Sequence, residues 1–454
     1  MHLAVSRACA LAAAGGLVAV GGAKQSSSSK QRGPAHAEGC LADGAPYPEH
    51  EGTQLRLVQV LHRHGARTPF VALPGMPQEG TPGWSSLWGQ CRLPPKAAVT
   101  AAARATENGG GGVPLSGEAA MAAGQAEAAA AATYGTCGKG QLTKLGEEQL
   151  MHLGTFLRRE YLEGPAGRLL AGGPVPPAEQ LAVTSTKTSR TILSVRSMLH
   201  GLLPEATDAD IEALVKVPRP FSMDILIANY ARCDRLRELF HEAKAHVDSS
   251  LMSVHTRARL AKEVGAMSQN LTLIAAGDPL RALVGQGAAL PGNVSEGLAE
   301  ELDACGHEMV DVANGRHSAE MRRLSMGLLL ADMHEQIMAA ADGRSPLRMA
   351  VRSAHDISVC GLLAALGLQV PGWPRFGSSV VTELRRDLQS GDFQVRIVCY
   401  DGVPGGGDGG KVIDVTVPLQ AWCDTVEPLI LSEEEYVREC SLPAGRAKPP
   451  PQAW

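Results

Sequence analysis

The feature that most constrains this chain of 454 residues is a pattern that occurs three times: an apolar strand, a polar turn and an apolar helix. The three strand segments are residues 55–61, 180–183 and 347–351. Strands that alternate with helices predict an α/β fold with a doubly wound, mainly parallel sheet flanked by helices. In such a sheet ligands bind at the carboxyl ends of the strands, so we expect the three turns to meet there.

The first turn follows residues 55–61 and carries two arginines around a histidine. Arg63 and Arg67 present planar forks that suit bidentate binding of phosphate or carboxylate. His64 lies between them, and a further positive charge is disfavoured there, so its imidazole should stay neutral and nucleophilic. Gly65 allows the backbone to turn without a Cβ clash. This turn predicts phosphoryl transfer through a phosphohistidine. It reads Arg63-His64-Gly65-Ala66-Arg67-Thr68-Pro69.

The other two turns supply complementary groups. A run of hydroxyl residues, 184–189, precedes Arg190, which opens a helix, and helix starts suit anions. Ser353-Ala354 is followed by His355 and Asp356 at the start of an apolar helix, residues 357–366. Together the turns offer cationic donors, one nucleophile and one carboxylic acid. They contain no cluster of carboxylates for a metal ion, so no cofactor is expected.

Each turn alone has an ordinary structural interpretation. Arginines near a turn are usually solvated, hydroxyl residues before a helix are commonly an N-cap cluster, and His-Asp is a common dipeptide in loops. The functional interpretation therefore depends on the convergence of all three turns at one edge of the predicted sheet.

In this order the motifs resemble the histidine acid phosphatases, branch 2 of the histidine phosphatase superfamily. The resemblance covers residues 52–441 and includes a Gly-Gln-Leu-Thr-x-x-Gly helix start at residues 140–146. That start and the long insertion at residues 71–139 most resemble the lysophosphatidic acid phosphatase subgroup. Two departures are Thr184, where the family usually has arginine, and Ile357-Ser358 after His-Asp, where phytase-like members have Thr-Asn. The second departure argues against inositol hexakisphosphate as substrate.

The resemblance implies a metal-independent acid phosphatase that hydrolyses phosphomonoesters, with lysophosphatidic acid as the candidate substrate. One alternative is a phosphotransferase or mutase acting on sugar or inositol phosphates. Another is a pseudoenzyme that binds anions without turnover. The implied roles are nucleophile for His64, phosphate binding for Arg63, Arg67, Arg190 and His355, and proton donor for Asp356.

Beyond the catalytic domain the sequence predicts several further segments. Residues 1–23 resemble a signal or targeting segment, because they combine one arginine with an apolar, small-residue run. Residues 24–50 and 443–454 are expected to be a disordered linker and tail, and part of the insertion is low in complexity. Residues 205–345 have helical periodicity without a catalytic motif and predict a cap subdomain.

The net charge of the chain bears on the kind of partner it can bind. The net charge of −5 gives no indication of a nucleic-acid surface, so the expected partner is a small phosphomonoester or a lysophospholipid, which would bring the protein to a membrane surface. The targeting segment favours the secretory pathway or the extracellular space, with a mitochondrion or other organelle as the alternative. The ten cysteines contain no CxxC pair, and disulfides are expected, but the sequence leaves their pairing open, as it does the oligomeric state.

Overall fold

The first long strand, β2 (Thr53–Arg63), runs through the middle of the sheet and ends in the predicted active turn. Almost every residue of β2 is buried, because helices cover both faces of the sheet. Leu57 and Leu61 belong to the apolar core on one face, while Val58 and Val60 belong to the core on the other. The computed structural model describes residues 49–92 and 134–448 apart from 51, 165–168, 219–220, 266–267, 269, 317, 370–371, 406–408, 443–445 and 447.

The sheet has eight strands in the order β10-β9-β8-β2-β7-β5-β6, and β1 pairs with β2. The half that carries the three turns, β2-β7-β5-β6, is parallel, as expected. The other half is antiparallel. Its hairpin of β8 and β9 is predicted by two strand-like segments, residues 380–386 and 393–400, with a turn sequence at residues 389–392 between them. The remaining strands are β1 (Glu49–His50), β5 (Leu181–Ser185), β6 (Val215–Lys216), β7 (Met349–Ala354), β8 (Ser379–Asp387), β9 (Phe393–Asp401) and β10 (Gly410–Pro418).

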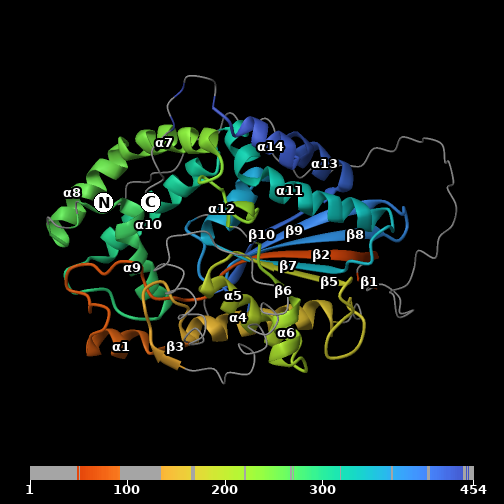
Figure 1. The fold of residues 1–454 in the computed structure, drawn as a ribbon, viewed down its shortest axis with the longest axis horizontal. Coiled ribbons are helices and arrows are strands. Elements are labelled where there is room, and N and C mark those ends of the chain that lie inside the picture. Colours follow the sequence, from red (N-terminus) through yellow and green to blue (C-terminus); the bar gives the residue numbers. More distant parts are fainter. Residues whose placement is uncertain are drawn as a thin grey trace, which may run out of the picture.

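Two helical layers enclose this sheet, and Figure 1 shows one below it and one above it. The expected α/β architecture is therefore confirmed. The lower layer contains α4 (Lys144–Tyr161), α5 (Ser189–Leu202) and α6 (Asp208–Leu214), and the upper layer contains α11 (Ala319–Ala341), α12 (Asp356–Ala365), α13 (Leu419–Val426) and α14 (Glu433–Glu439). Short 3₁₀ turns lie at Phe221–Met223 and Glu427–Leu429.

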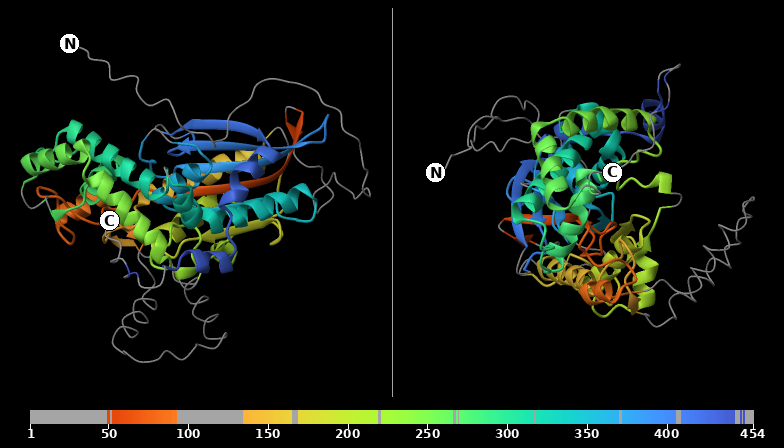
Figure 2. Two further views of the ribbon diagram at one scale, coloured as in Figure 1. Left: turned by 90° about the horizontal axis from the view of Figure 1, so that it is seen from above. Right: turned by 90° about the vertical axis from the view of Figure 1, so that its left-hand side faces the viewer.

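A helical cap extends from one end of the sheet, as Figures 1 and 2 show. It is shorter than the predicted residues 205–345, because α6 and α11 pack in the two layers on the sheet. Part of the long insertion packs against it, because Trp84 and Trp88 are buried with Leu280 and Leu298 in a separate apolar core. The cap helices are α7 (Asp234–Asp248), α8 (Leu251–Glu263), α9 (Leu273–Gly285) and α10 (Glu296–Ala313), and the described insertion contains α1 (Pro82–Trp88), β3 (Gln90–Arg92) and β4 (Tyr134–Thr136).

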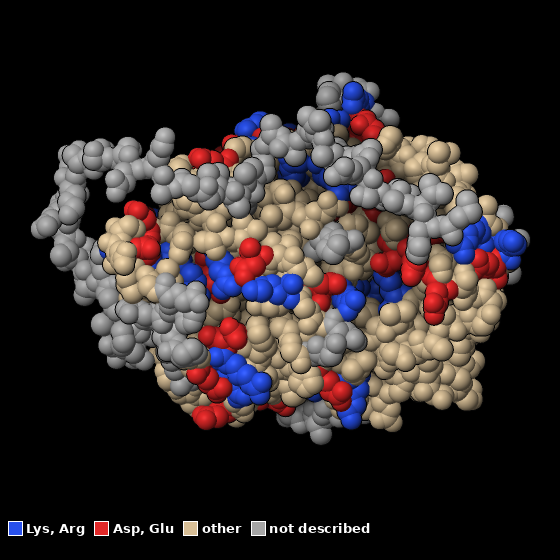
Figure 3. All heavy atoms as spheres, turned by 180° about the vertical axis from the view of Figure 1, so that it is seen from behind, with Lys and Arg blue, Asp and Glu red and all other residues tan. Residues whose placement is uncertain are grey.

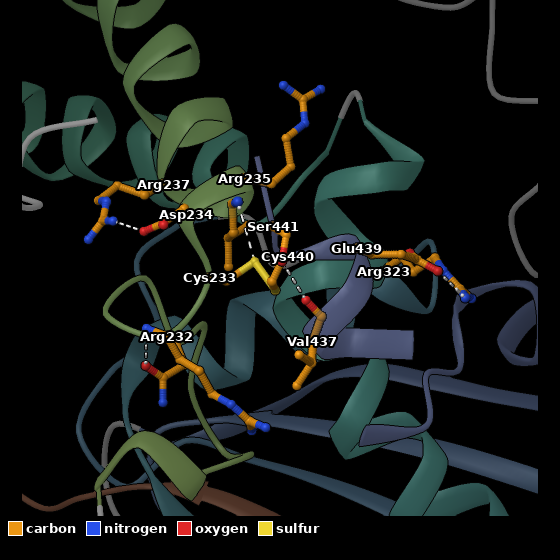
Figure 4. Close-up of a disulfide and its surroundings, with 12 residues drawn as sticks. Arg232, Cys233, Asp234, Arg235, Arg237, Arg323, Val437, Glu439, Cys440 and Ser441 are labelled. Carbon is orange, nitrogen blue, oxygen red and sulfur yellow. Dashed lines mark hydrogen bonds and ion pairs between the residues drawn. A yellow bond between two sulfur atoms is a disulfide. The ribbon is translucent and has the colours of Figure 1, made fainter. Parts of the chain in front are cut away.

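Two disulfides tie distant segments together. Cys91 pairs with Cys137 across the insertion, and Cys233 pairs with Cys440. Cys233 caps the start of α7, and Cys440 ends α14, so the second bond fastens the last helix to the cap (Figure 4). Sequence could not give these pairings, because each joins residues that only the fold brings together. The free cysteines among the described residues are Cys305, Cys360, Cys399 and Cys423, all of them buried.

Several predicted segments lie outside the residues that the structure describes. Residues 1–23 lie there, so the targeting segment remains a prediction, and so does a short Ala-rich helix that the sequence indicates at residues 117–132. Of the expected linker, residues 49–50 form β1. No helix in the described ranges is long and apolar enough to cross a bilayer. Basic and acidic side chains are interspersed over the face in Figure 3, in keeping with the small net charge.

Glycines allow α4 and α5 to cross at close range beneath the sheet. A Cβ added to Gly154 would overlap the carbonyl oxygen of Met198, and one added to Gly201 would overlap that of Met151. Both obstacles are helix backbone, which cannot move aside as a side-chain tip can. The two helices must therefore separate if either glycine gains a side chain.

We expect Gly154→Ala to lower the free energy of unfolding by at least ~2 kcal/mol, because the new methyl group has no space between the helices. Urea unfolding followed by circular dichroism would measure the change. Gly172→Ala is the control, because no atom lies within 4 Å of its added Cβ. Equal losses in the two variants would contradict the argument from the helix crossing.

Candidate active site

The three predicted turns meet at the carboxyl edge of β2, β7 and β5. Backbone hydrogen bonds join them: the N–H of His64 donates to the carbonyl of Ala354 at 3.1 Å, and that of Thr186 donates to Ser353 at 3.1 Å. These contacts arise because the three strands are neighbours in the parallel half of the sheet. All six candidate residues lie at this edge: Arg63, His64, Arg67, Arg190, His355 and Asp356.

His64 is buried, with 2% of its surface exposed, and its Nδ1 lies 2.9 Å from the carbonyl oxygen of Gly65. Since a carbonyl only accepts, Nδ1 carries the proton and donates, which leaves Nε2 unprotonated. Burial lowers the pKa of His64 well below its usual value, and the charges of Arg190 and Arg63 lower it further. The neutral state of His64 predicted from the neighbouring cations therefore has a larger cause, burial, which the sequence did not indicate.

Two arginines of the first turn are each held by a carboxylate. Arg63 Nη2 lies 2.8 Å from Asp356 Oδ2, and its other terminal nitrogen donates to the carbonyl of Pro374. Arg67 Nη2 lies 2.6 Å from Asp278 Oδ1, and Nη1 donates to Thr68 at 2.9 Å. Burial lowers the pKa of Arg63 to about 10, which leaves it cationic at neutral pH.

The second turn connects Arg190 to His355. Arg190 Nη2 donates to His355 Nδ1 at 3.3 Å, so the histidine Nε2 carries the proton and donates to Thr186 Oγ1 at 3.0 Å. Burial lowers the pKa of His355 to about 3, and Arg190 adds to this. His355 is therefore neutral. Its donor faces Thr186 in this structure, so contact with a phosphate requires an exchange of partner.

Asp356 begins α12 and lies beside Arg63. Its Oδ1 accepts from the N–H of Ile357 at 2.9 Å, and its Oδ2 accepts from the indole Nε1 of Trp373 at 3.1 Å. Burial alone raises the pKa of Asp356, but the charges of Arg63 and Arg67 outweigh it and hold the pKa well below its ordinary value. In the free site the carboxyl is thus ionised.

Sequence reasoning missed four residues around this set. Asp278 from α9 binds Arg67 and accepts from the backbone N–H of Phe70 at 2.8 Å. The Phe70 ring, which is 46% exposed, lies 4.3 Å from the guanidinium carbon of Arg67 and 5.2 Å from that of Arg190. Phe376 is buried between Arg63, at 4.1 Å, and the His64 ring, at 5.8 Å. The fourth missed residue is Trp373, which donates to Asp356. Isolated aromatic residues and one aspartate in a helical pattern carried no signal.

This geometry combines an unprotonated imidazole nitrogen, three guanidinium groups and a carboxyl group, which is a set suited to phosphoryl transfer. Residues 54–272 match the family described as histidine phosphatase superfamily (branch 2). The chain is thus similar to this superfamily over 219 of its 454 residues, and it is an enzyme of the acid phosphatase class.

Within the superfamily, similarity to lysophosphatidic acid phosphatase type 6 extends over most of the chain. The Bos taurus protein is 25% identical over 431 residues, which is 90% of this chain and 92% of that protein. Testicular acid phosphatase of Mus musculus is 30% identical over 272 residues, 56% of this chain and 61% of that protein. The apo form of Hafnia alvei phytase shares the fold, with a TM-score of 0.55 and 14% identity over 87% of this chain and the whole of that one.

His62, next to the site, allows the effect of burial on a histidine pKa to be tested through the pH dependence of stability. His62 is fully buried in β2, and burial lowers its pKa to about 4 although the hydrogen bond to the Arg63 carbonyl opposes this. An unfolded histidine has a pKa of about 6.5. The unfolded chain therefore binds the proton first as pH falls, so this contribution to stability is present above about pH 6.5 and is lost toward about pH 4.

We expect His62→Gln to reduce the loss of stability between about pH 7 and pH 5 by about 2 kcal/mol relative to the unaltered protein. Urea unfolding at pH 7 and pH 5 would measure the free energy of unfolding at each pH. A packing change that acts equally at both pH values cancels in the difference between the two free energies. The exposed His255, changed to Gln, is the control. A pH dependence unchanged by His62→Gln would refute the argument.

Proposed function

We propose that the chain hydrolyses phosphomonoesters through a phosphohistidine on His64, without a metal ion, and that lysophosphatidic acid is a substrate. The single observation that carries the mechanism is the hydrogen bond from His64 Nδ1 to Gly65, which leaves Nε2 free to attack. The substrate assignment is supported by the similarity to lysophosphatidic acid phosphatases over 90% of the chain.

The first step transfers the phosphoryl group to the histidine. Nε2 of His64 bonds to phosphorus as the bond to the ester oxygen breaks, and Asp356 gives its proton to the leaving oxygen. Arg63, Arg67 and Arg190 would bind the non-bridging oxygens, where charge is spread in the transition state. These guanidinium groups supply the charge neutralisation that a metal ion supplies in other phosphatases.

The second step returns the enzyme to its starting state. A water molecule attacks phosphorus, the P–N bond breaks, and Asp356 accepts a proton from that water. Inorganic phosphate leaves with the added oxygen, and His64 recovers its lone pair. Asp356 thus ends the second step protonated, as it was in the substrate complex, and it releases this proton when phosphate leaves the arginines.

Binding of the substrate would prepare Asp356 for its role as an acid. Its pKa is depressed because it faces arginine charges in the free site. A bound phosphate offsets those charges and adds negative charge nearby, so the pKa of the carboxyl rises in the complex. The protonated acid is depleted as pH increases, so kcat should fall on the alkaline side.

We expect His64→Ala to abolish phosphate release from lysophosphatidic acid and p-nitrophenyl phosphate at acid pH in EDTA, because the unprotonated nitrogen of His355 is bound by Arg190 and the Asp356 carboxylate is bound by Arg63. Asp356→Asn should flatten the alkaline fall in kcat and lower kcat by roughly 10²-fold or more with alkyl esters. Acid quenching with radiolabelled substrate should trap a labelled protein only when His64 is present.

An inactive but folded protein that binds phosphate would overturn the hydrolase and support an anion-binding role. Transfer of phosphate to an added sugar or alcohol in preference to water would instead support a phosphotransferase. Loss of activity in EDTA that Mg²⁺ restores would contradict the absence of a metal requirement.

The Phe70 ring lies exposed over Arg67 and Arg190, where it would meet the part of a substrate beyond the phosphate. If that part carries an acyl chain, Phe70→Ala should reduce kcat/KM for lysophosphatidic acid about three- to tenfold, through lost apolar burial. Glycerol 3-phosphate has the same phosphate and glycerol but no chain, so its kcat/KM should change little. Measurements below the critical micelle concentration would compare them, and equal losses would argue against acyl recognition at Phe70.

A further inference from the structure

Trp373 makes a contact with the catalytic acid that no motif indicated. Its indole Nε1 donates to Asp356 Oδ2, the oxygen that also lies 2.8 Å from Arg63 Nη2. The other oxygen, Oδ1, accepts from one backbone N–H, that of Ile357. An indole N–H only donates, so this bond keeps its direction in every protonation state of the carboxyl.

The indole is in turn held by the cap. The guanidinium carbon of Arg281, on α9, lies 4.0 Å from the centre of the Trp373 ring. Arg281 Nη2 donates to the carbonyl of Ile274 at 2.9 Å, and Nη1 lies 3.4 Å from Asp303 Oδ1, so the arginine is anchored to α9 and α10. Stacking of a cation on an indole face is favourable and fixes the plane of the ring.

Two cap glycines leave the space for this stack. A Cβ on Gly306 would lie 3.0 Å from the Trp373 ring, and a Cβ on Gly277 would lie 2.6 Å from Arg281 Nη1. Trp373 thus packs against the backbone of α10 on one side and contacts Asp356 at its edge. The cap contributes none of the six predicted site residues, and yet it reaches the acid through this contact.

We propose that Trp373, held by Arg281, is a positioning residue that orients Asp356 and directs its transferable proton to Oδ1. This inference rests on the proposed role of Asp356 as the acid. Because Oδ2 already accepts from Arg63 and Trp373, a proton there would compete with two donors, whereas Oδ1 competes with one. Without the indole N–H the carboxyl group can rotate and present either oxygen to the leaving group.

The proposal predicts an effect that depends on the leaving group. An alkoxide needs a proton to depart, whereas p-nitrophenolate is stable without one. Misplacement of the acid should therefore slow alkyl esters selectively. A merely structural role would slow both substrates alike, so the ratio of their kcat/KM values separates the two explanations.

The experiment compares glycerol 3-phosphate with p-nitrophenyl phosphate in the full chain. We expect Trp373→Phe to lower kcat/KM roughly tenfold for glycerol 3-phosphate and less than about twofold for p-nitrophenyl phosphate. Arg281→Met should change the ratio in the same direction, and Arg281→Lys, which retains the cation, should restore part of it. If Trp373→Phe fails to fold, the Arg281 variants give the same test.

Matched controls come from the same chain. Trp422 is a fully buried indole in the main core, and Arg232 stacks on Tyr436 away from the site, so Trp422→Phe and Arg232→Met should leave the ratio unchanged. Asp356→Asn gives the change in the ratio of kcat/KM values that results from complete loss of the acid. If it discriminates between the substrates and Trp373→Phe does not, the positioning role is wrong while the acid role stands. If Asp356→Asn does not discriminate either, the acid role fails and the inference fails with it.

Discussion

The structure depends on how three guanidinium groups are kept together in a largely buried site. Arg63, Arg67 and Arg190 repel one another, and burial removes most of the water that would screen them. Two carboxylates offset this repulsion, Asp356 on Arg63 and Asp278 on Arg67. The two imidazoles cannot add to the positive charge, because burial and the arginines keep both neutral. The nucleophile is thus a consequence of the same charge balance that binds the phosphate.

This balance also explains why one carboxyl group can serve two purposes. While the site is free, Asp356 is a counter-ion to Arg63, and its pKa is depressed for that reason. When an anion binds, its negative charge offsets the charges of the arginines, the pKa of Asp356 rises, and the same group becomes a proton donor. Asp278 contacts Arg67 from the cap and accepts a backbone N–H of Phe70, so it has a second partner that remains when a phosphate binds.

The sequence predicts the site residues that have reactive side chains and also lie at the end of a strand or the start of a helix. Arg63, His64, Arg67, Arg190, His355 and Asp356 each lie at a strand end or a helix start, so a rule about parallel sheets brought them together. Asp278, Phe70 and Trp373 reach the site by packing between segments far apart in the chain, and their local patterns are those of ordinary helix and loop residues. The antiparallel half of the sheet was foreseen only at the β8–β9 hairpin, where both strands and their turn are contiguous.

The long insertion leaves the active turn undisturbed because it departs from and returns to the same place. The N–H of Gly140 donates to the carbonyl of Pro69 at 3.2 Å, and that of Thr68 donates to Gln141 at 3.0 Å, so the two ends of the segment are hydrogen-bonded to each other. The disulfide between Cys91 and Cys137 closes the segment a second time, farther from the site.

Beneath this junction Gly65 rests directly on Gly146 of α4, where either Cβ would overlap backbone. Gly65 is therefore required by close approach, since its φ angle is not in the left-handed region. The cost of closing a loop grows only slowly with its length, so a segment bounded in this way can lengthen without moving Arg67. Selection can then alter the surroundings of the substrate while the groups that bind its phosphate stay in place.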